Sequence, residues 1–193
     1  ATTVSAGVLN IQNATALGTT AGGTMVGSGA ALQLQGGITV GAEALTLSGA
    51  GVSADGALRN VSGDNTYGGL LTLGAAARIN SDSGTLTLNN AGTITGSGFG
   101  LTVGGSGNTS ISSIIGTGNG TVTKDGAGTL TLSGANTFSG GLSLGAGQLN
   151  INNGSALGSG ALASITSTSS NTAFGYNALN AMNTSGTNTA IGS

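Results

Sequence analysis

The chain has 193 residues, of which 37% are hydrophobic and only 4% are charged, with 40 glycines and no Pro, Cys, His or Trp. The lack of Cys and His excludes most catalytic triads and zinc sites, and three cations are too few for a nucleic-acid surface. No apolar run approaches the length of a membrane span, so no membrane insertion is expected, while the aliphatic content predicts a folded chain.

Short segments of alternating apolar and polar residues follow one another along the chain, each ended by Gly, Asn, Ser or Asp. The unit Leu-Thr-Leu begins at Leu45, Leu86 and Leu130. Its leucines and threonines face opposite sides of a strand, because successive side chains alternate. No apolar stripe of helical spacing persists, and glycine interrupts at short intervals. The sequence therefore predicts an all-β chain.

Longer segments also recur. Residues 6–18 reappear as residues 146–158, and Ser62–Tyr67 reappears as Ser133–Phe138. Such near-copies are not expected in sandwiches or barrels, whose antiparallel strands differ, but they suit a solenoid, in which each coil lies on the one before. We therefore predict a right-handed parallel β-helix (a β-solenoid) with coils of roughly 20 residues, about eight of them, each rising ~4.8 Å.

The end of the chain differs from the rest. Residues 164–170 read Ser-Ile-Thr-Ser-Thr-Ser-Ser and are interpreted as a linker because few of them are apolar. Residues 171–175 then recur as residues 188–192, seventeen positions later, which is a second type of repeat. The expected organisation is a solenoid over 1–163, the linker, and a short C-terminal extension over 171–193.

Groups that carry out chemistry are few and scattered. Asp82 and Asp125 fall in different expected coils. Arg59 near Asp55, and Lys124 beside Asp125, are interpreted as exposed turn residues. We therefore predict no catalytic residue, no metal site and no cofactor, and we expect that the protein is not an enzyme.

One repeat resembles a known family. Residues 126–141 read Gly-Ala-Gly-Thr-Leu-Thr-Leu-Ser-Gly-Ala-Asn-Thr-Phe-Ser-Gly-Gly and are followed by Gly-Gln-Leu-Asn-Ile at 147–151. This pattern resembles the autotransporter-associated β-strand repeat, also called the passenger-associated transport repeat, over about residues 1–163. The resemblance implies a right-handed β-helix passenger that is exported to the cell surface or the extracellular space. Residues 171–192 are similar to head repeats of trimeric autotransporter adhesins, which implies a trimerising segment or a tail that docks on a neighbouring subunit.

The leading functional hypothesis is a secreted structural subunit of an extracellular filament, sheath or surface layer. An uncapped solenoid exposes strand edges at both ends, and such edges pair readily. A head-to-tail contact of this kind continues into an open fibre, so the expected partner is a second copy of the chain. The candidate stacking residues match between an early and a late coil: Leu9, Asn10 and Ile11, and Leu149, Asn150 and Ile151.

Two other roles stay open at this point. An adhesin would bind glycans or host surfaces along one face, but aromatic platforms are few, and Tyr67 and Phe138 are equivalent by repeat and expected to pack in the core or in turns. Ice binding would use flat Thr-x-Thr arrays such as residues 85–87 and 129–131, although outward threonines on exposed strands account for these as well.

Overall fold

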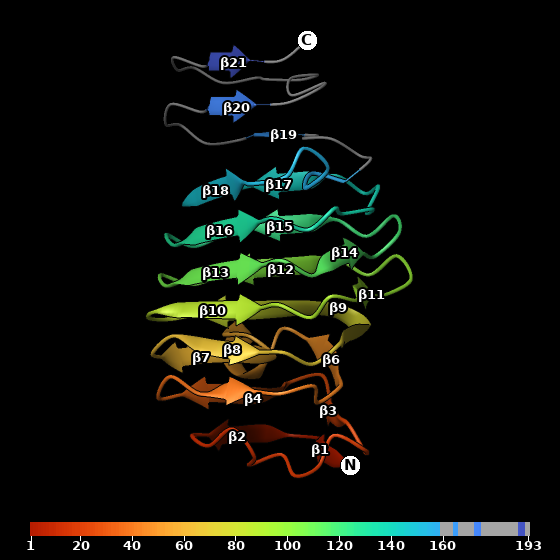
Figure 1. The fold of residues 1–193 in the computed structure, drawn as a ribbon, viewed down its shortest axis with the longest axis vertical. Coiled ribbons are helices and arrows are strands. Elements are labelled where there is room, and N and C mark those ends of the chain that lie inside the picture. The colour runs from red at the N-terminus through yellow and green to blue at the C-terminus, as the bar shows by residue number, and fades with distance from the viewer. Residues whose placement is uncertain (159–163, 166–171, 175–188, 192–193) are drawn as a thin grey trace.

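The computed structural model describes residues 1–158, 164–165, 172–174 and 189–191. Within this part the chain is a stack of short parallel strands that wind upward from the N-terminus in about seven turns (Figure 1). The described residues contain no α-helix and a single 3-10 turn, η1 (Val52–Ala54). The prediction of an all-β parallel β-solenoid is therefore confirmed.

Parallel pairing between successive coils arranges the strands in three columns, which we call faces. The first face holds β1 (Thr2–Val4), β3 (Thr24–Val26), β6 (Leu45–Gly49), the start of β9 (Leu71–Ser81), β11 (Thr93–Thr95) and β14 (Ile114–Gly116). The second face holds β2 (Gly7–Ile11), β4 (Ala30–Gln35), β7 (Leu58–Ser62), the end of β9, β12 (Leu101–Gly104), β15 (Val122–Lys124), β17 (Leu142–Leu144) and β19 (Ser164–Ile165). The third face holds β5 (Thr39–Val40), β8 (Asn65–Tyr67), β10 (Thr85–Leu88), β13 (Asn108–Ile111), β16 (Thr129–Leu132) and β18 (Gln148–Ile151).

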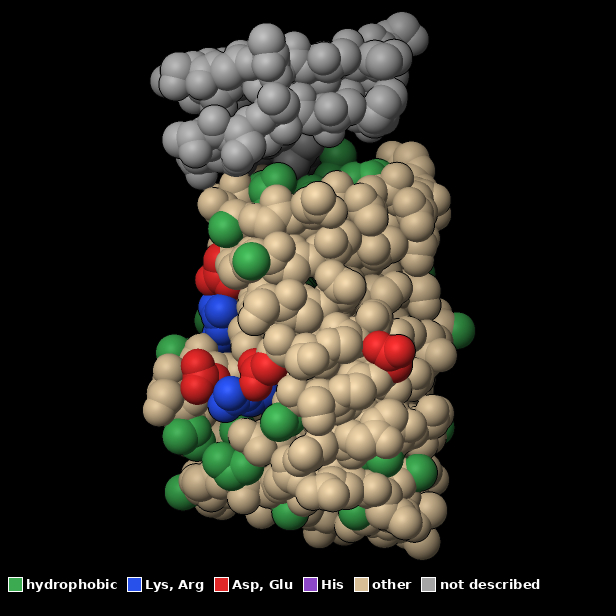
Figure 2. Space-filling view, turned by 90° about the vertical axis from the view of Figure 1, so that its left-hand side faces the viewer, with side chains coloured by type: hydrophobic (Ala, Val, Ile, Leu, Met, Phe, Trp, Pro, Cys, Tyr) green, Lys and Arg blue, Asp and Glu red, His purple; other side chains and the backbone are tan. Residues whose placement is uncertain are grey.

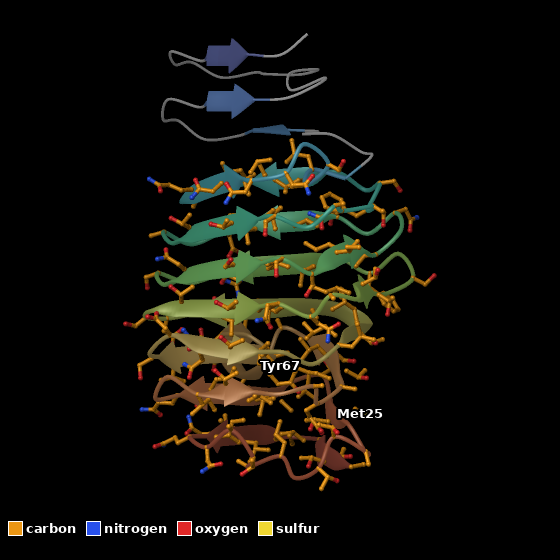
Figure 3. All side chains as sticks on the ribbon, viewed as in Figure 1. Met25 and Tyr67 are labelled. Atoms are coloured by element: carbon orange, nitrogen blue, oxygen red, sulfur yellow. The ribbon has the colours of Figure 1, made fainter. Side chains whose placement is uncertain are left out.

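Stacked aliphatic side chains form the core. On the second face Leu32 pairs in register with Leu58, and Leu58 with Ile79, and all three are fully buried. Their neighbours along each strand point outward, because side chains alternate between the two sides of a strand. Complete burial of such a side chain stabilises the fold by about 1.5–3 kcal/mol. The regular Leu-Thr-Leu pattern thus becomes a continuous aliphatic interior (Figure 3).

Two buried asparagines, which are equivalent by repeat, tie neighbouring coils together. The Asn65 side-chain oxygen accepts a hydrogen bond from the backbone N–H of Ile38 at 2.7 Å. The Asn136 side-chain oxygen accepts one from the N–H of Ile115 at the same distance, and its Nδ2 donates to the carbonyl of Ala156. Each amide therefore satisfies backbone groups at corners where the strand ladder is interrupted.

Each of these asparagines is followed two residues later by a buried aromatic ring. Tyr67 (Figure 3) and Phe138 are both fully buried, so the expectation that they pack in the core is confirmed. The Tyr67 hydroxyl has no hydrogen-bond partner, and neither does Oε2 of the buried Glu43. Burial raises the pKa of Tyr67, and the negative charge of Glu43 raises it further.

Tyr67→Phe is expected to reduce the loss of folding stability that the native protein shows above pH 10. The buried phenol stays neutral in the folded protein, so its contribution to stability is complete below its usual pKa of 10 and is lost as the pH rises above that value. The native chain should lose about 1.4 kcal/mol per pH unit in this range through this one group. Urea unfolding at pH 7 and pH 11 measures the difference between the two proteins. At pH 7 the variant should be at least as stable as the native protein. If the free energy of unfolding fell equally with pH in the two proteins, the hydroxyl would not be buried without a partner.

The predicted C-terminal boundaries fall largely outside the described residues. Ser164 and Ile165, the first two residues of the predicted linker, form β19 and pair with β17. β20 (Thr172–Phe174) pairs with β21 (Thr189–Ile191) in parallel and in register, with Thr172 opposite Thr189. The remainder of the linker and of the head-like extension lies outside the described residues.

Candidate assembly surfaces at the ends of the solenoid

The long-range repeats do not return to the same face of the solenoid. The copy at 6–18 forms β2 on the second face, whereas the copy at 146–158 forms β18 on the third face. In the same way, Asn65 lies in β8 on the third face, whereas Asn136 bonds to Ile115 of β14 on the first face. The repeat length is therefore a whole number of coils plus one third, so each near-copy is turned by one face about the axis.

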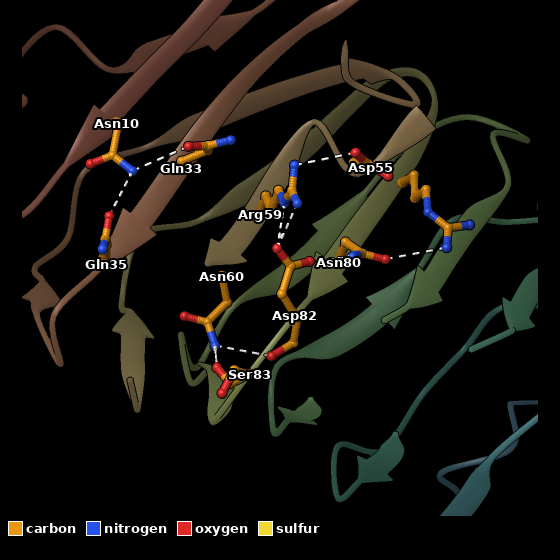
Figure 4. A network of polar contacts seen from close by, with 11 residues as sticks. Asn10, Gln33, Gln35, Asp55, Arg59, Asn60, Asn80, Asp82 and Ser83 are labelled. Atoms are coloured by element: carbon orange, nitrogen blue, oxygen red, sulfur yellow. Dashed lines mark hydrogen bonds and ion pairs between the residues drawn. The ribbon is translucent and has the colours of Figure 1, made fainter. Parts of the chain in front are cut away.

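At the N-terminal end, β2 pairs with β4 and with no other strand of the described part. Ile11 is buried, Leu9 is half-buried and Asn10 is exposed. Nδ2 of Asn10 donates to the side-chain oxygens of Gln33, at 3.1 Å, and Gln35, at 3.3 Å (Figure 4). These contacts link the first two coils on the outer side of the second face.

At the other end, β18 pairs with β16 and with no other described strand. Leu149 and Ile151 are half-buried, whereas Leu130 and Leu132, which lie beneath them in register, are fully buried. Asn150 is exposed. Within the described residues, this edge therefore presents partly exposed apolar side chains that a further coil would cover, and its outer side pairs with no described strand.

The two predicted triplets, 9–11 and 149–151, are not brought together within one molecule. They lie near opposite ends of the stack and on different faces (Figure 1). A contact between them would require two copies of the chain, one of them turned by one face relative to the other.

A small ionic patch occupies the outer side of the second face. Arg59 contacts Asp55 at 3.3 Å and Asp82 at 2.7 Å (Figure 4). Its hydrogen bond to Asp82 raises the pKa of Arg59, against the opposing effect of partial burial. Arg78 makes a two-pronged contact with Asp125, at 2.8 Å for each bond. Figure 2 shows these charges gathered over the middle coils, on a surface otherwise almost free of charge.

Both arginines are thus paired with carboxylates, and the third cation, Lys124, is buried. The interpretation of Arg59 and Lys124 as exposed turn residues was wrong, since Arg59 lies in β7 and is half-buried, and Lys124 lies in β15 and is only 2% exposed. Lys124 points inward from β15, in register between Val103 and Leu144. Its ammonium group donates to the backbone carbonyls of Asp125 at 2.6 Å and Gly126 at 2.8 Å.

Burial lowers the pKa of Lys124, and the nearby Asp125 charge works in the opposite direction. The sequence held a usable signal for this burial, because alternation puts Lys124 on the same side of its strand as the inward Val122. The signal was overruled by the general rule that lysines are rarely buried. The charge is tolerated here because strand ends at the corner supply carbonyl acceptors.

The described residues contain no cluster of three or more His, Cys, Asp or Glu side chains that could hold a metal ion. They also contain no helix with the length and apolar character needed to cross a bilayer.

Comparison with known proteins adds a family assignment for one segment. The fold is a parallel β-solenoid built from Gly-rich repeats. Residues 122–151, which run from β15 to β18, match the family model of the passenger-associated transport repeat. The expected resemblance is therefore confirmed over this segment, and the chain is a parallel β-solenoid that contains a passenger-associated transport repeat. Comparisons with curated proteins and with solved structures gave no match.

Proposed function

We propose that this chain is a structural shaft of a secreted or cell-surface protein, which assembles by head-to-tail stacking of its solenoid ends. The observation that carries the proposal is the half-buried Leu149 and Ile151 at the edge of β18, where inner coils bury the corresponding leucines completely. Covering these side chains with another coil removes apolar surface from water and continues the strand ladder. The passenger-associated transport repeat supports a location outside the cytoplasm.

The residues best suited to this contact are those of β2 on an approaching copy. Stacking β2 on β18 places Leu9 over Leu149, Asn10 over Asn150 and Ile11 over Ile151. Identical side chains in register pack closely and allow asparagine ladders, as in other parallel stacks. The low surface charge does little to oppose association.

Charge substitutions at the exposed asparagines test the contact. We expect the double variant Asn10→Lys with Asn150→Lys to assemble poorly, because like charges directly opposite one another on neighbouring strands are destabilising. The pair Asn10→Lys with Asn150→Asp should assemble again. Sedimentation and electron microscopy over a concentration series measure both. The matched control is the double variant Thr87→Lys with Ser110→Lys, which places two lysines opposite each other on the third face, away from the ends of the solenoid. Failure of the opposite-charge pair to restore assembly would argue against β2 on β18.

The same proposal includes an absence of catalysis and of cofactors. The two arginines are paired with carboxylates and the lysine donates to backbone carbonyls, so we assign no catalytic role to these three cations. The partner we propose is the chain itself.

An adhesive role is the second candidate. One observation favours it: a hollow of about 340 Å³ in the outer wall, lined by small residues such as Ala50, Ala54 and Ala76 and bordered by Arg78 and Thr102. Such a hollow offers an apolar floor and a guanidinium rim to a glycan or another cell-surface group. A glycan array probed with the chain and with Arg78→Ala tests this role, and binding that is unaffected by the substitution would argue against the hollow.

A further inference from the structure

The edge that a neighbouring copy would need is already partly occupied. β19 lies on β17, with Ser164 opposite Ser143 and Ile165 opposite Leu144. β17 leads directly into β18, since both belong to the same coil. A second copy that stacks on this coil must therefore meet β17 and β18 together.

The N-terminal segment of the chain has the spacing required for this double contact. Val4 in β1 precedes Leu9 in β2 by five residues, and Leu144 in β17 precedes Leu149 in β18 by the same number. A copy that places Val4 over Leu144 therefore places Leu9 over Leu149 at the same time. Both pairs are apolar, and they lie on the inner side of their strands.

The chain's own continuation does not match the spacing. Ile165 takes the place over Leu144, but the residue five positions later is Ser170, within the sequence Ser-Ser-Asn-Thr at 169–172. At this spacing the sequence after β19 thus has a serine, not a leucine or isoleucine, to set opposite Leu149. The incoming β1–β2 segment has an apolar residue at both positions of this spacing, whereas the resident segment has one only at the first.

We propose that β19 competes with β1 of a second copy for the edge of β17, and that assembly requires β19 to leave that edge. This inference rests on the head-to-tail stacking proposed above. It adds the register of the contact and identifies β19 as a segment of the same chain that opposes assembly. The second copy sits turned by one face about the common axis, because its β1, from the first face, lies over the second face, and its β2 lies over the third. β19 is short, with two residues, so its ladder is a weak barrier.

The competition is tested by weakening β19 in the full chain. Proline cannot donate to a ladder, so Ile165→Pro should release the β17 edge. We expect the concentration at which filaments form to fall by about five-fold or more, the change that corresponds to losing one or two strand hydrogen bonds. Ser169→Pro, in the same segment but outside β19, is the matched control. Circular dichroism and thermal unfolding establish that both variants retain the β-solenoid.

The register is tested by disulfide trapping, since the chain has no cysteine of its own. In the Ile165→Pro background, Thr3→Cys with Ser143→Cys should form covalent oligomers, because Thr3 lies over Ser143 in the turned register. Val8→Cys with Ser143→Cys reports the unturned register, in which β2 stays on its own face.

Each outcome is decisive. Trapping by the Thr3 pair together with earlier assembly of Ile165→Pro supports the proposal. Trapping by the Val8 pair instead overturns the turned register. Equal assembly of Ile165→Pro and Ser169→Pro overturns the competition but leaves stacking in place, whereas no assembly of any variant at high concentration overturns the stacking itself.

Discussion

Gly105→Ala is expected to destabilise the solenoid by about 2–5 kcal/mol. Alanine disfavours the left-handed backbone conformation at this position, and its Cβ would overlap with backbone atoms of the coil below. Gly105 has a φ of +98° at the corner after β12. An added Cβ would lie 2.6 Å from the carbonyl carbon of Ser81 in the coil below and closer still to its oxygen. The contact is with backbone, so no side-chain rotation can release it. Thermal and urea unfolding of the variant measure the loss.

Gly29→Ala is the matched control for this effect. Gly29 also has a positive φ, +79°, but an added Cβ there meets no atom within 4 Å. Its cost should be that of the backbone conformation alone, about 1–2 kcal/mol. If the two alanine variants were equally stable, close approach between coils would not be what requires glycine at Gly105.

Phe138→Ala should lose about 3–5 kcal/mol, the usual cost of emptying a buried aromatic site in a packed core. The ring is fully buried and lies two residues after Asn136, which bonds to the coils on either side. The cavity would open where Gly158 passes against the ring, since a Cβ at Gly158 would already be 3.2 Å from it. Equilibrium unfolding in urea gives the free-energy difference.

The same substitution at Phe99, which is only partly buried, controls for the chemistry of the change. Phe99→Ala should cost less than half as much, because less apolar surface leaves water there when the protein folds. A loss at Phe138 no greater than that at Phe99 would contradict the interior position of the Phe138 ring.

The arrangement of the charged residues could be read from the sequence only in part. Scattered carboxylates and few cations were visible, but the pairing of Arg78 with Asp125, 47 positions apart, depends on which coils meet. The burial of Lys124 was signalled by strand alternation, yet it also required carbonyl acceptors at the corner, which only the folded chain supplies. The sequence match between residues 9–11 and 149–151 was evident, but the faces on which these strands lie were not.

The sequence by itself determined the class of fold. Alternating Leu-Thr-Leu segments, glycine-rich turns and near-copies at long spacing require stacked parallel strands, because local strand pattern and turn chemistry are properties of a few neighbouring residues. Tertiary structure alone decided where each copy lies around the axis. Coil lengths vary between 20 and 27 residues on the second face, so a repeat offset such as 140 residues does not reveal that β18 has turned by one face from β2. That turn depends on the accumulated lengths of all the corners between them, which no single segment encodes.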